Sequence, residues 1–175
     1  MVFTGCPSSE MSIRILLDQY DEAQQWVSQL KDVFGPERLF VEVMNHGIDI
    51  EKKLVPGQLM MAKHMGLRLV ATDDSHYARR SDAKHHEEML CIQSGARMSD
   101  KPADQGGRRF TFAGDKYYVK SARHMSSLFP EDDFPGALSN TLLVTEMASD
   151  LAVTFNPHLR PYPKIPEGFE SDVEY

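Results

Sequence analysis

Three short apolar segments, each interrupted by polar or turn-forming residues, are the feature that most constrains the fold of this chain. The first segment ends at Cys6, the second at Asn45 and the third at Asp74. Stretches with the periodicity of amphipathic helices separate them, as expected of parallel βα units of roughly 30 residues or more. Because crossovers between parallel strands are right-handed, we expect three adjacent strands with these polar residues at one end of the sheet.

The segments between and after the strands carry helix signals. Apolar residues spaced three and four apart predict one helix through residues 13–33, which Gly35 ends. A second helix is expected to run to about Met65, although Pro56 leaves its start open. A third helix is expected over residues 82–94. Three successive βα units of this kind indicate the α/β fold class.

The pattern changes at about residue 98. Residues 109–112 and 117–120 predict a small hairpin, and residues 121–129 and 135–149 predict two helices. The prolines and glycines that follow argue against regular structure. The expected organisation is therefore βα units over residues 1–97, a hairpin with helices over residues 98–150, and a Pro-rich linker over residues 151–175.

Asp74 and His76 form the motif with the clearest chemical meaning. They follow a short apolar run that includes the β-branched Val70 and Thr72, as at the end of a buried strand. Residues i and i+2 of an extended segment point the same way, so both side chains can reach one metal ion or one phosphate. Zinc, manganese or iron would suit this pair better than calcium. The alternative is that Asp74 caps the next helix and His76 lies on the surface.

Composition excludes several classes of function. The chain has 175 residues, of which 41% are hydrophobic and 26% charged, as in ordinary globular domains. Its net charge of -7 argues against a broad nucleic-acid-binding face. Two cysteines, Cys6 and Cys91, make no disulfide framework, so a cytoplasmic location is expected. No segment is long and apolar enough to predict a membrane span.

Three parallel strands alone would leave exposed sheet edges. A closed (β/α) barrel needs roughly 200 residues or more, which this chain does not have. We therefore expect the chain to be the later part of a larger barrel.

Six motifs follow one another along the chain: TGCPS (4–8), LFVEVMNHG (39–47), ATDDSHY (71–77), HEEMLCIQSG (86–95), YYVKS (117–121) and ALSNT (137–141). In this order they resemble a known family, the alpha subunits of bacterial replicative DNA polymerase III, and the similarity covers nearly the whole chain. The resemblance implies that the matched region is the C-terminal part of the polymerase-and-histidinol-phosphatase (PHP) domain, followed by the lead-in to a palm domain.

The resemblance implies a partial, distorted (β/α) barrel of PHP type and a divalent-metal centre of the zinc or manganese class. Cys6, Asp74 and His76 match metal-ligand positions of the family, and we expect them to converge at one strand end. In intact domains of this kind the metals support 3′–5′ exonuclease activity or have a structural role. For Cys6 the alternative is a small buried residue. His46 matches no ligand and is expected to support the site or to lie on the surface, with contact to a substrate as a third alternative.

The resemblance also implies that much of the family's machinery lies elsewhere. Most of the PHP ligands would precede Met1, and the palm carboxylates would follow Tyr175. The chain is therefore expected to be a replicase fragment that is inactive alone, with a weak or empty metal site. DNA and other replicase subunits would be partners of the intact protein. Two alternatives stay open: a free-standing PHP-type phosphoesterase, and a non-catalytic docking module for a proofreading partner.

Overall fold

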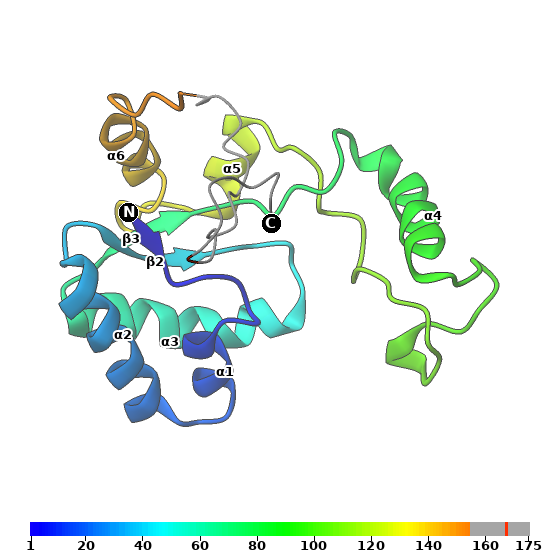
Figure 1. The fold of residues 1–175 in the computed structure, drawn as a ribbon, viewed down its shortest axis with the longest axis horizontal. Helices are drawn as coiled ribbons and strands as arrows, with labels where there is room; N and C mark the ends of the chain where they lie inside the picture. Colours follow the sequence, from blue (N-terminus) through cyan, green and yellow to red (C-terminus); the bar gives the residue numbers. More distant parts are fainter. Residues whose placement is uncertain (155–166, 168–175) are drawn as a thin grey trace.

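A three-stranded parallel sheet lies at the centre of the structure, a computed structural model that describes residues 1–154 and 167 (Figure 1). Its strands are β1 (Val2–Phe3), β2 (Leu39–Val43) and β3 (Arg68–Ala71), in the order β1-β2-β3. The predicted parallel strands and their adjacent placement are confirmed, and the fold class is α/β. The PHP-type barrel stays a prediction.

The register brings the carboxyl ends of the strands to one edge of the sheet. Phe3 pairs with Phe40, and Val43 pairs with Ala71. All five residues of β2 are buried, because this central strand is covered on both faces. The loops that leave the three strands therefore start close together.

Helices cover the two faces of the sheet (Figure 1). On one face lie α1 (Glu10–Leu16), α2 (Tyr20–Phe34) and α3 (Asp49–Met65), and on the other lie α5 (Ala122–Leu128) and α6 (Ser139–Met147). Apolar side chains from both layers join one core with the strands. Its buried members outside the sheet include Met11, Val27, Met61, Phe129, Phe134 and Ala137.

The single helix predicted for residues 13–33 is wrong, because two helices occupy this stretch. Residues 17–19 separate α1 from α2, and Asp18 adopts a left-handed conformation there (φ 58°). The backbone N–H of Gln19 donates to the carbonyl of Arg14 at 2.9 Å. This bond gives a partner to one of the last carbonyl groups of α1, which have none within the helix. The break lets α1 and α2 pack against each other and both against α3, as one straight helix could not.

α3 continues through Pro56, the residue that left its predicted start open. Because proline has no N–H, the carbonyl one turn earlier loses its helical partner. The neighbouring Gly57 lies against α1, and a Cβ at this position would be 2.6 Å from Cγ2 of Ile15. Glycine thus permits the close approach of α1 to α3. Gly66, in a left-handed conformation, ends the helix as predicted.

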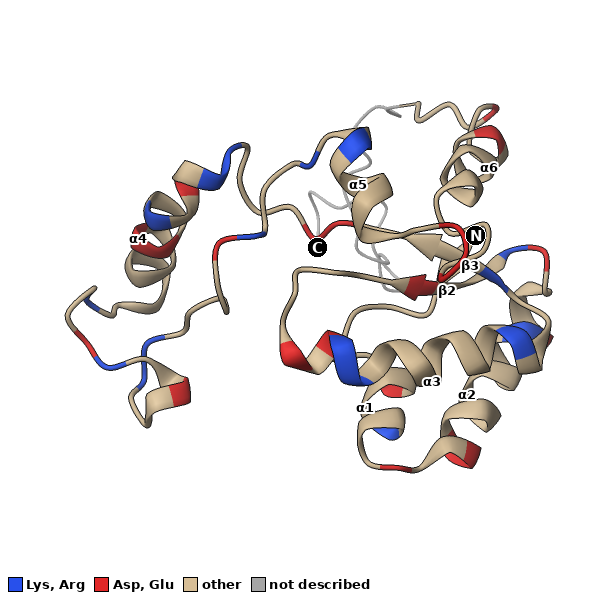
Figure 2. Ribbon diagram, turned by 180° about the vertical axis from the view of Figure 1, so that it is seen from behind, with Lys and Arg blue, Asp and Glu red and all other residues tan. Residues whose placement is uncertain are grey.

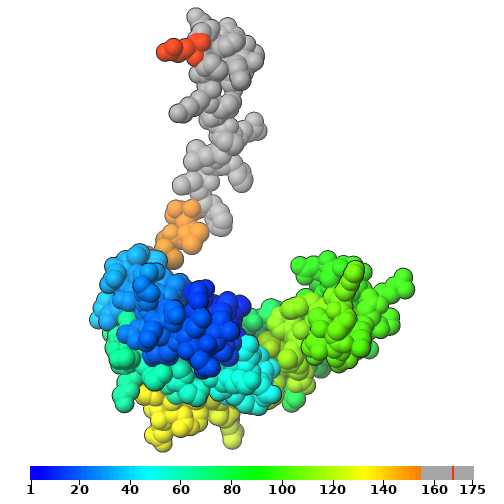
Figure 3. Space-filling model, turned by 90° about the horizontal axis from the view of Figure 1, so that it is seen from below, coloured from blue at the N-terminus to red at the C-terminus, as the bar shows by residue number. Residues whose placement is uncertain are grey.

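The residues after β3 form an arm that projects from the sheet and its helices (Figures 2 and 3). It contains two short 3₁₀ helices, η1 (Arg80–Asp82) and η2 (Ala103–Gln105), and the longer α4 (Ala83–Ser94). α4 confirms the helix predicted over residues 82–94. Acidic and basic residues are interspersed along the arm (Figure 2).

The hairpin predicted for residues 109–112 and 117–120 is wrong. The second of these segments runs instead beside the chain that follows β3, where the backbone N–H of His76 donates to the carbonyl of Tyr117 at 2.7 Å. The rings of Phe112 and Tyr117 meet edge to face, with centroids 4.7 Å apart. Pairing with residues 76 and 77 supplies hydrogen-bond partners to the backbone of this segment and buries Tyr117, which an isolated two-stranded hairpin would leave exposed.

The helix predicted for residues 135–149 begins later than expected, because its first residues bind the edge of the sheet. The backbone N–H of Ala71 donates to the carbonyl of Ala137 at 2.9 Å. The side-chain amide of Asn140 donates to the carbonyl of Leu69 at 2.8 Å. These contacts cover the outer side of β3.

Of the elements predicted after residue 120, one is confirmed and one lies mostly outside the described residues. The helix predicted for residues 121–129 is confirmed as α5. The linker predicted for residues 151–175 lies outside the described residues from 155 onward, apart from residue 167, and residues 151–154 have no regular secondary structure. Within the described part of the chain, no helix has the length and apolar character needed to cross a membrane.

Replacing Asp18 by glycine should preserve the free energy of unfolding or raise it by up to about 1 kcal/mol, because glycine adopts the left-handed conformation without the steric cost of a Cβ. Asp21→Gly, at an exposed position in the first turn of α2, should instead lower it by about 1 kcal/mol. Urea denaturation followed by circular dichroism measures both. Equal losses in the two variants would contradict this account of the helix break.

Candidate functional site

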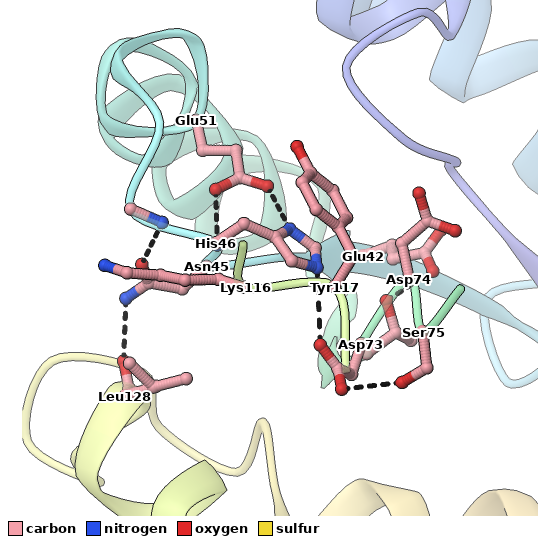
Figure 4. Close-up of polar contacts among 12 residues, drawn as sticks. Glu42, Asn45, His46, Glu51, Asp73, Asp74, Ser75, Lys116, Tyr117 and Leu128 are labelled. Carbon is pink, nitrogen blue, oxygen red and sulfur yellow. Dashed lines mark hydrogen bonds and ion pairs between the residues drawn. The ribbon is translucent and has the colours of Figure 1, made fainter. Parts of the chain in front are cut away.

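Polar side chains gather where the three strands end, and Figure 4 shows those that follow β2 and β3. Cys6 follows β1, His46 follows β2, and Asp73 and Asp74 follow β3. Figure 2 shows the acidic ribbon at the end of β2 and just after β3. The edge of the sheet predicted to carry the chemistry is therefore the edge that collects these groups.

Asp74 and His76 lie next to each other at this edge. Oδ1 of Asp74 is 3.2 Å from Nε2 of His76, and the two side chains are 47% and 33% exposed. Asp74 caps neither of the helices that follow it, since the N-caps of η1 and α4 are Arg79 and Asp82. The capping alternative for Asp74 is therefore wrong, and the pair faces one another as the sequence spacing predicts.

Cys6 lies at the same end of the sheet but contacts other groups. Its Sγ is 3.0 Å from Oγ of Ser8, and it lines a narrow cavity with Glu42 and Glu51. Over residues 1–154 and 167, no cluster of three or more His, Cys, Asp or Glu side chains is arranged to hold a metal ion. The structure thus brings the other two predicted ligands together without Cys6, whose role as a ligand stays a prediction.

His46, expected from the sequence either to support the site or to lie on the surface, is a buried group. Its side chain is only 2% exposed, so the surface position considered for it is wrong. Nδ1 of the ring is 2.6 Å from Oε1 of Glu51, and the backbone N–H of His46 donates to Oε2 of the same residue at 2.6 Å. Glu51 lies in the first turn of α3. Its carboxylate therefore fixes both the ring and the backbone at the end of β2.

Asp73 joins this pair to a distant part of the chain. Nζ of Lys120, whose side chain is 1% exposed, donates at 2.5 Å both to Oδ1 of Asp73 and to the carbonyl of Lys116. Nε2 of His46 is 3.3 Å from the same Oδ1, an ion-pair distance without the alignment of a hydrogen bond. We call Glu51, His46, Asp73 and Lys120 the buried network; Figure 4 shows its first three members.

The pKa of Asp73 is lowered from its ordinary value. Burial of the carboxyl raises its pKa, but hydrogen bonds from Lys120 and Ser75, together with neighbouring positive charge, outweigh this effect. Oγ of Ser75 donates to Oδ2 of Asp73 at 2.8 Å. The positive charge of Lys120 acts in the same direction as these bonds. Asp73 is therefore a carboxylate at neutral pH and supplies the negative partner that a buried ammonium requires.

Tyr117 connects the buried network with the exposed pair. Its ring stacks on that of His46, with centroids 4.3 Å apart and planes inclined by 14°. Its centroid lies 6.0 Å from that of His76. Burial, followed by the charges of Glu51 and Asp74, raises the pKa of Tyr117 to about 12. Tyr117 is therefore a neutral phenol that fills the space between the two histidines.

Further hydrogen bonds tie the strand ends to one another. The hydroxyl of Thr72 donates to Oε1 of Glu42 at 2.7 Å, which links β3 to β2. The side-chain amide of Gln58 donates to the backbone carbonyl of Glu42 at 3.0 Å, which links α3 to β2. Because both contacts lie beside the loops that follow the strands, they hold the edge of the sheet in one arrangement.

Known proteins of similar sequence agree on one name. A protein named DNA polymerase III subunit alpha from Saccharopolyspora erythraea is 46% identical over 143 residues, which are 82% of this chain and 11% of that protein. The subunit alpha of Mycobacterium tuberculosis is 36% identical over 171 residues, or 97% of this chain and 14% of the relative. The chain is homologous to one segment of the DNA polymerase III alpha subunit. No family model matches the chain.

The homology to alpha subunits extends to distant bacteria. The alpha subunit of Thermus aquaticus is 33% identical over 178 aligned positions, which cover 100% of this chain and 14% of the relative. The resemblance recognised in the sequence is thereby confirmed. The chain spans 11% to 14% of the length of these three alpha subunits. The aligned segment contains both the Asp74–His76 pair and the buried network.

The members of the buried network carried weak signals in the sequence. His46 and Asp73 stand at strand ends where polar residues were expected, next to Asn45 and Asp74. Lys120 follows an apolar segment, and a lysine at such a position is usually exposed to solvent. Its role becomes visible only when its segment lies against the end of β3.

Lys120→Met should lower the free energy of unfolding by about 3 kcal/mol, because it leaves the Asp73 carboxylate buried without its ammonium partner. The pKa of Asp73 should rise, since burial then acts with less opposition. A lowered pKa stabilises the fold above the unfolded carboxyl value of about 3.9, and this contribution is lost as pH falls through the folded value. That acid-side loss should therefore shrink or reverse in the variant. Urea denaturation and carbon-13 NMR titration measure these effects.

Lys52→Met is the matched control. The ion pair between Lys52 and Asp49 is exposed, with side chains 64% and 87% accessible, so its loss should cost at most about 1 kcal/mol. Lys120→Arg keeps the positive charge and should leave the pKa of Asp73 lowered. Equal destabilisation by Lys120→Met and Lys52→Met would show that the buried ion pair is not a major source of stability.

Proposed function

We propose that the chain is part of the PHP domain of a DNA polymerase III alpha subunit, and that Asp74 and His76 belong to its divalent-metal centre. The observation that supports this most directly is the 3.2 Å separation of Asp74 Oδ1 and His76 Nε2 at the carboxyl end of β3. Homology to alpha subunits and the parallel α/β sheet agree with the assignment.

The pair fits a metal ion by distance and by chemistry. Two ligands at roughly 2.1 Å from one tetrahedral ion lie about 3.4 Å apart, close to the observed separation. A carboxylate oxygen beside an imidazole nitrogen suits a metal of the zinc or manganese class. We include Cys6 as a thiolate ligand of the same centre, for which its sulfur would have to exchange the contact with Ser8 for the metal.

The surrounding residues would hold the proposed ligands in position. Asp73, next to Asp74, is bound by Lys120 and approached by His46. The backbone N–H of His76 is bound to the carbonyl of Tyr117. Ligands whose backbone is already fixed lose less conformational freedom on binding, so this support should raise metal affinity.

A bound divalent metal supplies polarisation of a phosphodiester and a lowered pKa of bound water. We therefore propose that in the intact subunit this centre serves 3′–5′ hydrolysis of DNA or stabilises the domain. Asp74 contributes negative charge, and His76 contributes a nitrogen donor. The ligands that complete a PHP centre are proposed to come from other parts of the intact protein.

The name that the relatives share suggests a role for the parent protein. We propose that the parent protein is a DNA-directed DNA polymerase, a nucleotidyltransferase that acts in chromosomal replication in the cytoplasm. Its partners would be DNA and the other subunits of the replicase. With a net charge of -7, this chain is unsuited to broad contact with DNA, which we assign to other parts of the parent.

Zinc binding by the purified 175-residue chain should be weak, and Asp74→Asn or His76→Asn should weaken it about tenfold or more, since each removes a direct ligand. Competition with a chromophoric chelator measures the affinity. Asp132→Asn and His85→Asn are matched controls at exposed positions. Equal affinity in all four variants would remove Asp74 and His76 from the metal centre. Cys6→Ser tests the thiolate separately.

The isolated chain should show neither primer extension nor metal-dependent trimming of a DNA 3′ end. The reason is that the palm carboxylates and most PHP ligands implied by the family are not among its residues. Gel electrophoresis of a 5′-labelled primer–template, with zinc, manganese or magnesium, measures both activities. Trimming that disappears in Asp74→Ala would show that the chain is a nuclease by itself.

A further inference from the structure

We propose that a pocket in the arm beside His76 binds the base of a nucleotide. The pocket lies between α4 and the loop that contains Gly114, and it has a volume of about 260 Å³. Sites for drug-sized ligands are usually roughly 300–1,000 Å³, so this pocket suits one small ring system. Its position in the arm distinguishes it from the strand-end pair and from the buried network.

Aromatic side chains form much of the pocket wall. Tyr77, His86 and Phe112 all line it. The ring centroid of His86 lies 5.4 Å from that of Tyr77 and 5.2 Å from that of Phe112, so the three side chains form one connected set. Flat π-surfaces around a small space are the arrangement by which proteins stack single bases.

Polar groups at the same pocket can recognise the edge of a base. Asp115 lines it and is held by two hydrogen bonds from Arg80, at 2.8 and 3.0 Å. Glu87 also lines it and is paired with Arg109. Carboxylate oxygens accept hydrogen bonds from exocyclic amino groups, as in contacts of Asp and Glu with cytosine. The pocket therefore combines stacking surfaces with fixed acceptors.

The strand-end pair lies next to the pocket, because His76 contacts two residues of the pocket wall. The ring of His76 lies 4.3 Å from that of Phe112 and 5.1 Å from that of His86, measured between centroids. A base among these rings would place its sugar and phosphate beside Asp74 and His76. That step rests on the proposed function, whereas recognition of the base rests on the pocket alone. The ligand would then be the terminal nucleotide of a DNA strand.

Binding is tested with the purified 175-residue chain in EDTA, so that metal affinity plays no part. The probes are deoxyadenosine monophosphate, deoxycytidine monophosphate and 2-deoxyribose 5-phosphate, and proton–nitrogen NMR titration follows their binding. A nucleotide should bind at least about tenfold more tightly than the sugar phosphate, since stacking of a base contributes this much or more. The largest shifts should come from the backbone amides of Tyr77, His86 and Phe112.

Phe112→Ala should weaken nucleotide binding at least about fivefold, and His86→Ala provides a second test if the first variant does not fold. Phe34→Ala is the matched control, because it removes a partly exposed phenyl ring of α2, remote from the pocket. Equal binding of the sugar phosphate and the nucleotides would overturn the inference, as would unchanged affinity in Phe112→Ala and His86→Ala. Nucleotide binding that persists in Asp74→Asn would support the pocket even if the metal centre proved absent.

Discussion

The ion pair between Lys120 and Asp73 joins two parts of the chain that are 47 positions apart in sequence. The segment between them is the whole projecting arm, with α4 and the aromatic pocket. The ion pair therefore closes the base of a long loop and fixes where the arm leaves the sheet. The contacts among His76, Phe112 and Tyr117 depend on this closure, because two of these residues come from one side of the loop and one from the other.

Because the ion pair is buried, its two charges attract each other strongly but also lose their hydration. Removing an ammonium and a carboxylate from water costs several kcal/mol per ion, and only close partners offset that cost. Here Lys120 binds Asp73 and a backbone carbonyl, while Ser75 and His46 approach the same carboxylate. His46 is fixed in turn by Glu51. The polar groups thus neutralise one another in a sequence of short contacts that runs from α3, past the ends of β2 and β3, to the start of α5.

The parts of the fold that the sequence predicted are those set by local pattern. The parallel strands, α4 and α5 follow from apolar spacing, and the Asp74–His76 pair follows from its place two residues apart in the extended chain after β3. The break at Asp18 did not, because a continuous apolar stripe masks it, and neither did the pairing of Tyr117 beside His76. Lys120 was missed for the same reason: its partner lies far away in sequence, and local pattern carries no information on such a contact.

The hydrogen bonds with Ala137 and Asn140 that cover the outer edge of β3 affect how this molecule can associate with others. An outer strand normally offers a row of free N–H and C=O groups to which a foreign strand can add. Here the carbonyl of Ala137 and the amide of Asn140 already occupy the groups of Ala71 and Leu69 that face outward. A strand from another molecule would have to break both hydrogen bonds before it could pair with β3. This side of the sheet is thus protected against templated aggregation by a short loop and the first turn of one helix.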